Sequence, residues 1–431
     1  MRRHSALAWV FFSVGTAHAA DVLTLDAALA AAREHQPQLV QVRATIESAR
    51  SRVDVAGAGL LPQVQAQASY GLQTRNLPDT GATSRLMGAG TSSFDVNGTL
   101  SAGVSASQLI YDFGRTTGQR DVSRTNVEVA IANERVLRQQ IGLGVRQTFA
   151  DVQAQKALLA VAQTTLENQK KHEEQTKAFI EAGTRPPIDG VQARVDRANA
   201  VVQLVNAENG YLSAKARLNQ ACGVVREDDF DVDEAPMAPV PGEDAAASGL
   251  LDAAIQASPG LLALQTQLKA AEQTITATHA GLWPILDATT GLNESGPGPT
   301  TMAWNWQGLV RLTWPLYQGG ITTAQEAAAR MDLLALRAQL DGATQNLRLR
   351  IEQARLAVRA GKEAAAASEE ALMAATERLR LAEGRYETGS GSIIELADAQ
   401  LGLTNAAAQK VRAQHDVAIA RAELMAALGG E

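Results

Sequence analysis

The chain of 431 residues has a single cysteine, few aromatic residues and no long apolar run beyond its N-terminus. The one cysteine, Cys222, cannot form an internal disulfide, so we expect a small buried residue at the end of a helix. Because no later stretch holds about 18 uncharged apolar residues, the sequence predicts no transmembrane helix. The formal net charge of −7 argues against nucleic acid as a partner.

Motifs of catalysis and of metal or phosphate binding are also absent from the sequence. The 6 histidines are scattered, without the His-Glu-x-x-His pattern or the Cys/His spacing of a zinc site. There is no Gly-x-Ser-x-Gly elbow, and the run Gly57-Ala58-Gly59 lacks the third glycine of a nucleotide-binding loop. We therefore expect neither an enzyme nor a bound cofactor or metal.

The first residues, 1–19, have the pattern of a secretory signal peptide. Arg2 and Arg3 precede an apolar run at 6–14, and Ala17-His18-Ala19 provides the small residues of a cleavage site. The mature chain should then begin near Ala20 and function outside the cytoplasm. No cysteine stands directly after this cleavage site, which argues against a lipoprotein anchor.

The rest of the chain is an internal duplication. We predict a first repeat at 20–223, an acidic and proline-rich linker at 224–249, and a second repeat at 250–431. From residue 111 onward a single offset of 206 residues relates the two repeats, so that Gly183 corresponds to Gly389. A chance match would not keep its spacing over this length.

Each repeat combines two strands with one long helix. Alternation of apolar and polar residues predicts strands with one apolar and one polar face. Apolar residues at spacings of three and four, often alternating with small residues, predict long helices that pack as coiled coils. The predicted strands are 62–75, 93–110, 284–293 and 301–314, and the long helices are about 115–181 and 321–387.

Every tryptophan of the predicted mature chain belongs to the second pair of strands. Trp283 and Trp314 lie at the end nearest the helices, whereas Trp304 and Trp306 lie near the connecting loop. Two aromatic belts on short strands are typical of an outer-membrane β-barrel, where the rings lie at the lipid–water interfaces. The alternative is a soluble sheet with its tryptophan face on a core, which the polar residues on the other face of all four strands disfavour.

Four strands are too few to close a barrel. Two copies would give eight strands and a filled interior, whereas three copies would give twelve strands around water. Because one strand face is polar, we expect a homotrimer with a wet pore and with outer-membrane lipid around it.

The whole predicted mature chain resembles the TolC-like outer-membrane efflux protein family. The resemblance rests on the two repeats, on the Ala-Gly-Leu-x-Pro sequences at 58–62 and 280–284, and on the motifs at 182–184 and 388–399. It implies a mainly α fold with a membrane β part, namely a trimeric twelve-stranded β-barrel continuous with a twelve-helix periplasmic α-barrel. It also implies a passive exit duct of a tripartite efflux or type I secretion system, with a periplasmic adaptor and an inner-membrane pump (RND or ABC type) as partners.

The resemblance further assigns roles at the two turns around residues 183 and 389, which would form the periplasmic tips. Glu395 and Asp398 match the acidic pair that lines the periplasmic constriction of such channels, and their spacing puts both on one helix face. Three copies would surround a narrow pore with carboxylates and favour cations. Tyr386 matches a tyrosine that helps to tie the closed tip. The residues expected at the tips and at the adaptor docking surface are Gly183, Thr184, Asp189, Tyr386, Gly389 and Ser390.

Two positions depart from the family pattern. Gln414 stands where the last helix is expected to carry an arginine, and Gly391 stands where a tip arginine is common. A pair of Asp189 with Arg194 or Arg185 could replace these closed-state links. The alternative to the channel is a secreted periplasmic coiled-coil structural or adaptor protein. Within the channel class, the sequence leaves open whether drugs, metals or proteins are exported.

Overall fold

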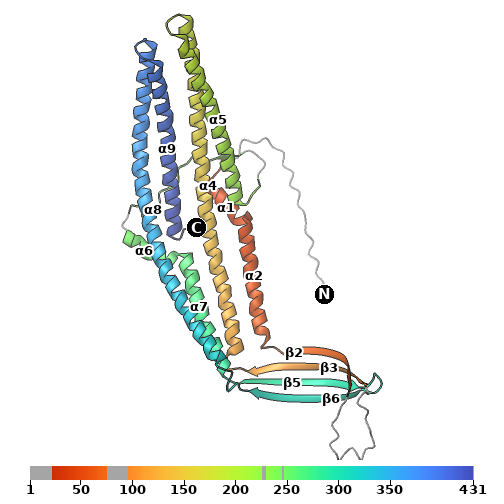
Figure 1. Ribbon diagram of the computed structural model, residues 1–431. Coiled ribbons are helices and arrows are strands. Elements are labelled where there is room, and N and C mark those ends of the chain that lie inside the picture. The colour runs from red at the N-terminus through yellow and green to blue at the C-terminus, as the bar shows by residue number, and fades with distance from the viewer. Residues whose placement is uncertain (1–21, 75–95, 226–229, 245–246, 431) are drawn as a thin grey trace, which may run out of the picture. The chain divides into compact units, whose positions relative to one another are not determined.

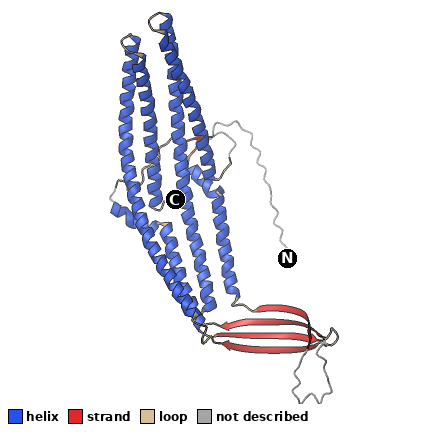
Figure 2. Ribbon diagram, viewed as in Figure 1, coloured by secondary structure: helices blue, strands red, loops and turns tan. Residues whose placement is uncertain are grey.

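The computed structural model describes residues 22–74, 96–225, 230–244 and 247–430 (Figure 1). The predicted signal peptide at 1–19 lies outside the described residues, as does the loop between the first two strands. Long helices make up most of the described chain and four long strands form one sheet (Figure 2). No helix in these described ranges has a stretch long and apolar enough to cross a membrane.

The chain packs as two compact units, and each unit takes residues from both repeats. The tip unit comprises Met1–Val40, Arg135–Ser258 and Gln345–Glu431, and the strand unit comprises Gln41–Glu134 and Pro259–Thr344. Each long helix, α4 (Arg115–Glu181) and α8 (Ile321–Glu387), contributes residues to both units. The sequence repeats are therefore not the packing units.

The strand unit contains one antiparallel sheet in the order β2-β3-β5-β6. β3 pairs with β5, so the two repeats join in the middle of the sheet. Among the described residues, β2 and β6 each pair on one side only. The strands are β2 (Gln63–Thr74), β3 (Val96–Tyr111), β5 (Ile285–Gly296) and β6 (Ala303–Thr313).

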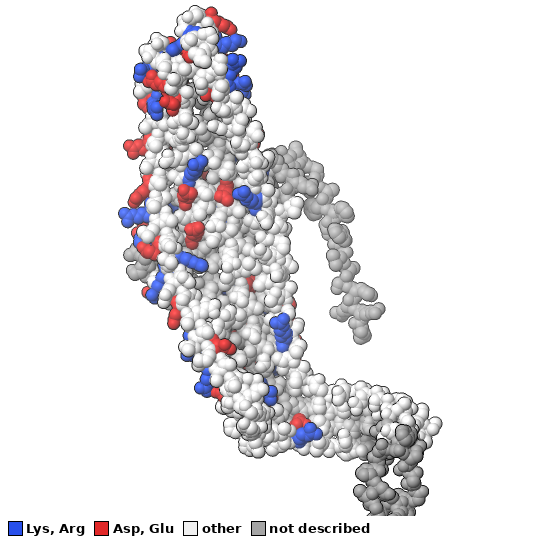
Figure 3. Space-filling model, in the orientation of Figure 1, with Lys and Arg blue, Asp and Glu red and all other residues white. Residues whose placement is uncertain are grey.

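The register of the sheet puts the predicted apolar residues of all four strands on one face. Ala66 lies opposite Val104, which lies opposite Leu292, which in turn lies opposite Trp306. The next row holds polar residues and glycine on the other face: Gln65, Ser105, Gly291 and Gln307. The apolar face is not covered within the unit, since Val64, Tyr70 and Trp306 all remain more than 60% exposed. The face drawn in Figure 3 shows few charged side chains over the strands.

Helices α2 (Pro37–Ala58) and α7 (Pro259–His279) precede the two hairpins of the sheet, with a 3-10 turn η1 (Ala280–Leu282) after α7. Within the strand unit they pack on the long helices through polar contacts as well as alanines. Thr125 of α4 donates to Gln273 of α7 at 2.6 Å, and His279 lies 3.0 Å from Glu326 of α8. The close approach of α4 to α7 needs glycine, because a Cβ at Gly118 would lie 3.0 Å from the Ala277 side chain.

In the tip unit each long helix turns back into a second helix. α4 is followed by α5 (Pro187–Cys222) and α8 by α9 (Ile393–Ala427), and we name these pairs the first and the second hairpin. Shorter elements complete the unit: α1 (Leu25–His35), α6 (Ala247–Ala257), and β1 (Val22–Leu23) in parallel with β4 (Asp231–Val232). Cys222 is buried at the end of α5, as predicted.

The predicted helical seam is largely buried in the tip unit. Along α8 the buried residues recur at spacings of three and four, and Gly361 lets α9 approach so closely that a Cβ there would lie 3.0 Å from Val417. The same spacing on α4 buries part of the corresponding set of the first repeat, whereas Thr148, Gln155 and Leu159 are half-buried. The buried seam residues include Ile351, Ala354, Val358, Leu379, Ala382 and Tyr386 on α8 and Val145, Val152, Ala162 and Leu166 on α4.

Candidate functional site at the helix tips

Both tips are tight turns that depend on glycine. Gly183 and Gly389 have φ angles of 73° and 78°, a left-handed conformation that residues with a Cβ rarely adopt. Side-chain hydroxyls satisfy carbonyls that the ending helices leave open: Thr184 donates to the Phe179 carbonyl at 2.9 Å, and Ser390 donates to the Arg385 carbonyl at 3.1 Å. All four turn residues, Gly183, Thr184, Gly389 and Ser390, are exposed, which leaves this surface accessible.

Arg185 connects the first tip to the second. Its guanidinium donates to the Tyr386 carbonyl at 2.5 Å and to the Gly391 carbonyl at 3.3 Å. The same group lies over the Tyr386 ring, with 4.1 Å between the Arg185 Cζ atom and the ring centroid. A planar cation therefore contributes a cation–π contact and several hydrogen bonds in one place. The sequence offered Arg185 as a partner of Asp189, but these contacts join Arg185 to the second hairpin.

Tyr386 is the centre of the packing between the two tips. It is 3% exposed and lies in an apolar cluster with Leu379, Leu396 and their neighbours on α8 and α9. From the first hairpin, the rings of Phe179 and His172 meet it edge-on, with centroids 6.2 Å and 5.5 Å away. Its hydroxyl is buried and has no hydrogen-bond partner among the described residues. Tyr386 thus supports the tip from inside.

Polar groups surround this aromatic cluster on the first hairpin. His172 is buried, and burial lowers the pKa of its imidazole although Asp196 and Asp189 act in the opposite direction. Asp189 is itself buried in the first turn of α5. Further along, Gln169 donates to Gln400 of α9 at 2.9 Å. The contact between the hairpins is therefore partly polar.

Glu395 and Asp398, the acidic pair at the start of α9, have different surroundings, and only Asp398 is an exposed carboxylate. Ser392 caps the helix by accepting from the Glu395 amide at 3.2 Å. The Glu395 carboxylate pairs with Arg385, the last basic residue of α8, at 2.8 Å, whereas Asp398 is exposed one turn later. Arg385 neutralises part of the negative charge expected from this pair. The sequence prediction did not include Arg385. Its position in the last turn of α8, with Glu395 in the first turn of the helix after the tip, could have suggested this ion pair.

The tryptophans lie in the strand unit, where the sequence placed them. Trp304 and Trp306 are in the first half of β6, and Trp314 follows the strand. Trp314 donates to the Leu282 carbonyl at 3.2 Å, which fixes this ring near Trp283, the residue that follows η1 and precedes β5. Phe113 stacks on Trp283 with 5.5 Å between ring centroids and contacts Tyr111 edge-on. The sequence prediction did not include Phe113 and Tyr111 among these aromatic residues.

Metal-binding groups do not occur in the part of the chain that the structure describes: no three His, Cys, Asp or Glu side chains there could hold one ion. At the tips, the Glu395 carboxylate meets an arginine, and Arg185 meets carbonyl groups and an aromatic ring. The site is thus a set of contacts between helices.

Comparison with known proteins gives one family and relatives along nearly the full length. The family model described as "Outer membrane efflux protein" matches residues 28–224 and 250–430, which are the two repeats without most of the linker. "Outer membrane efflux protein BepC" of Brucella suis is 24% identical over 424 residues, covering 97% of this chain and 88% of that protein. "Pyoverdine export outer membrane protein OpmQ" of Pseudomonas putida is 24% identical, covering 94% of this chain and 86% of that protein. Among solved structures, CusC has a TM-score of 0.78 at 18% identity and covers 94% of this chain and 92% of its own.

Proposed function

Because the chain belongs to the outer membrane efflux protein family, we propose that it is the passive outer-membrane duct of a tripartite export system. The chain is a transport protein of the outer membrane and not an enzyme. A periplasmic adaptor and an inner-membrane pump complete the system. The single observation that carries this proposal is the family match over both repeats, which includes the strands as well as the helices. A secreted coiled-coil protein would not account for the strands.

Three copies of the chain form the duct. The sheet has two edges, β2 and β6, that pair on one side only within the described residues, and its apolar face is exposed. Unpaired edges and an exposed apolar face both cost free energy in water. Closure of three sheets into a twelve-stranded barrel removes the edges, turns the apolar face to lipid and turns the polar face to a water-filled pore. The helices of the three copies continue the duct into the periplasm.

Fractionation and electrophoresis test this assembly. We expect the protein in the outer-membrane fraction, as a trimer whose migration changes on heating because the barrel unfolds. Recovery as a soluble monomer in the periplasm would refute the duct. The buried Cys222 is the only cysteine, so cysteines introduced at β2 and β6 can report on contacts between copies with little background.

The cargo depends on the pump. The relatives differ in the cargo that their names give, pyoverdine for one and cations for another. The polar strand face of a passive duct has no binding chemistry that would choose between such cargoes, and the carboxylates at the tips act only on charge at the narrow end. We therefore expect the chain to accept whatever its pump and adaptor deliver.

The helix tips gate the duct. Arg185 holds the two tips of one chain together through Tyr386 and Gly391, and Asp398 and Glu395 contribute carboxylates beside them. In a trimer these carboxylates surround the narrow end and attract cations. The exposed turns at Gly183 and Gly389 are the docking surface for the adaptor.

Single-channel conductance tests the gate. Arg185→Ala removes the link between the tips, so we expect a larger conductance, whereas Arg185→Lys keeps the charge and should give a smaller effect. The double variant Glu395→Ala with Asp398→Ala should lower cation selectivity and block by divalent cations. If selectivity and block stay unchanged in the double variant, these carboxylates do not form the constriction.

A further inference from the structure

The linker between the two repeats is attached to both hairpins by charged side chains. Residues 230–244 of the linker are described, and they contain five acidic residues and three prolines. Two of the acids, Asp231 and Glu243, each lie between the two helices of one hairpin. We define these contacts as the Asp231 anchor on the first hairpin and the Glu243 anchor on the second.

The Asp231 anchor joins the linker to α4 and α5. Lys156 of α4 pairs with the Asp231 carboxylate at 2.8 Å, and the hydroxyl of Tyr211 on α5 donates to the other carboxylate oxygen at 3.2 Å. Phe230 is buried beside it, under the ammonium group of Lys215 on α5 at 4.6 Å from the ring centroid. The anchor therefore holds one end of the linker on both helices of the first hairpin.

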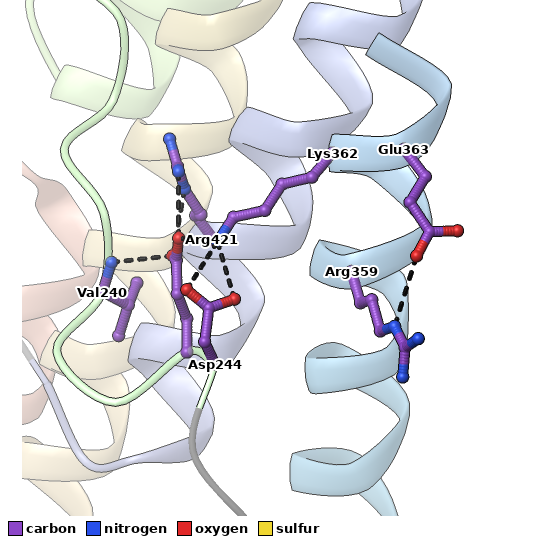
Figure 4. Close-up of polar contacts among 7 residues, drawn as sticks. Val240, Asp244, Arg359, Lys362, Glu363 and Arg421 are labelled. Carbon is purple, nitrogen blue, oxygen red and sulfur yellow. Dashed lines mark hydrogen bonds and ion pairs between the residues drawn. The ribbon is translucent and has the colours of Figure 1, made fainter. Parts of the chain in front are cut away.

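The Glu243 anchor joins the linker to α8 and α9. Arg421 of α9 donates to both Glu243 oxygens, at 3.0 Å and 3.1 Å, and Lys362 of α8 lies 2.6 Å from one of them. The linker's own Val240 amide completes the set at 2.9 Å. Figure 4 labels Arg421, Lys362, Asp244 and Val240 around this contact. The Glu243 side chain is only 4% exposed, so its charge depends on these partners.

Between the anchors the linker crosses from one hairpin to the other over a cleft. The cleft measures about 720 Å³ and is lined by small residues of α4 and α9, such as Ala157, Ala160 and Ala407. Glu234, Pro236 and Met237 of the linker contribute to its wall. Side chains do not fill this space, and a direct contact between α4 and α9 there is the one between His415 and Asp151 at 2.7 Å. The linker supplies a second connection there.

The composition of the linker suits a connection of constant length. Pro236 and Pro239 favour an extended, stiff backbone between the anchors, and Pro241 lies in the turn that the Glu243 amide closes on the Val240 carbonyl at 3.0 Å. Hydrogen bonds keep this segment on the helices, since Gln153 of α4 donates to the Asp233 carbonyl and Arg421 donates to the Met237 carbonyl. The chain between Asp231 and Glu243 therefore has little slack.

We propose that the linker is a tie between the two hairpins, fixed by Asp231 at one end and by Glu243 at the other. It limits how far the hairpins separate at the level of the cleft, while the tips beyond it stay free to move. Release of either anchor loosens this level without removing any contact at the tips. This role does not depend on the cargo, the pump or the gating of the duct.

Exchange and distance measurements on the purified full-length protein test the tie. Hydrogen exchange of residues 232–242 reports on the anchors. Spin labels at cysteines replacing Glu208 on α5 and Glu363 on α8 report on the separation of the hairpins, with labelled copies diluted into unlabelled ones. In Glu243→Gln and in Asp231→Asn we expect exchange in the linker to be faster by about tenfold or more. We also expect a broader distribution of distances between the labels.

Matched controls use neighbouring acids with the same partners but more exposure. Asp244→Asn removes a carboxylate that also pairs with Lys362 but is 79% exposed, and Glu234→Gln removes an exposed partner of Lys156. Both should leave exchange and distances unchanged. A third variant inserts six glycine and serine residues between Pro239 and Val240, which keeps both anchors but adds slack, and it should broaden the distances.

Two results would overturn the tie. Unchanged linker exchange in Glu243→Gln and Asp231→Asn would mean that these acids do not hold the linker. A narrow distance distribution in the lengthened variant would mean that linker length does not restrain the hairpins. The lengthened variant also covers the case in which loss of a buried charge prevents folding.

Discussion

The Glu243 carboxylate is nearly enclosed and touches two cationic groups. Burial by itself raises the pKa of the Glu243 carboxyl, but the hydrogen bonds from Arg421, Lys362 and the Val240 amide outweigh burial and lower that pKa from 4.5 to about 2. A carboxyl with a lowered pKa stabilises the folded state when it is ionised. Ion pairs that stabilise the folded state are therefore found in the linker as well as at the tips.

We predict that Glu243→Gln destabilises the protein by about 3–5 kcal/mol at neutral pH, because it leaves two cations without their buried partner. The difference between the wild type and the variant should be fully present above pH 4.5 and should disappear as the pH falls from 4.5 through about 2. Thermal unfolding of the detergent-solubilised protein at several pH values measures it. Asp244→Asn is the control and should change stability by much less.

His415 should stabilise the protein at low pH rather than at high pH, the opposite of Glu243. Its imidazole lies 2.7 Å from Asp151 of α4 and 3.3 Å from Asp416, and the hydrogen bond to Asp151 outweighs burial and raises the pKa of His415 above 6.5. The protonated ring thus joins α9 to α4. Its contribution to stability should be fully present below pH 6.5 and lost as the pH rises through the raised pKa. A comparison of His415→Gln with the wild type across this range tests it, and a constant difference would contradict it.

At the scale of elements, the second tip turn requires glycine at position 389, whereas the last turns of the helix before it do not require glycine at position 384. Gly389 has a φ of 78°, and a Cβ added there would have no neighbouring atom within 4 Å, so only backbone strain opposes a side chain. We predict that Gly389→Ala costs about 1–2 kcal/mol. Gly384 lies within α8 with equally open surroundings, and Gly384→Ala should stabilise the protein by about 0.5–1 kcal/mol through helix propensity. Equal effects of the two substitutions in unfolding experiments would contradict this account.

Elements were also the scale at which sequence periodicity was most informative. The bounds of α4 and α8 follow from apolar residues at spacings of three and four, and those of the strands from alternation, because each period reflects the geometry of one element. The order of the strands in the sheet could not be predicted from periodicity. Pairing of β3 with β5 joins segments from different repeats, and nothing local in either strand specifies its partner.

At the scale of the whole molecule, the two faces of the sheet meet different solvents if three copies enclose a pore. Val104 lies on the apolar face and Ser105 on the polar face of the same strand, near its middle. We predict that Val104→Arg costs about 2–4 kcal/mol in the membrane and lowers the amount of assembled protein. Ser105→Arg should leave assembly intact. Quantification of heat-modifiable protein in the outer membrane checks both, and equal amounts for the two variants would contradict a lipid-facing apolar side.

The amino-acid sequence by itself determined the repeats, the element types, the two faces of the sheet and the family. Each of these follows from patterns that are local or that recur at a fixed offset, as in the correspondence of Gly183 with Gly389. Only the tertiary structure decided which charged groups meet. Arg185 contacts Tyr386, Glu395 pairs with Arg385, and Glu243 lies between Arg421 and Lys362. These contacts depend on the rotation and axial position of each packed helix. The local sequence around an acidic residue, on a long amphipathic helix or in a linker, does not distinguish its cationic partner from the many other lysines and arginines of the chain.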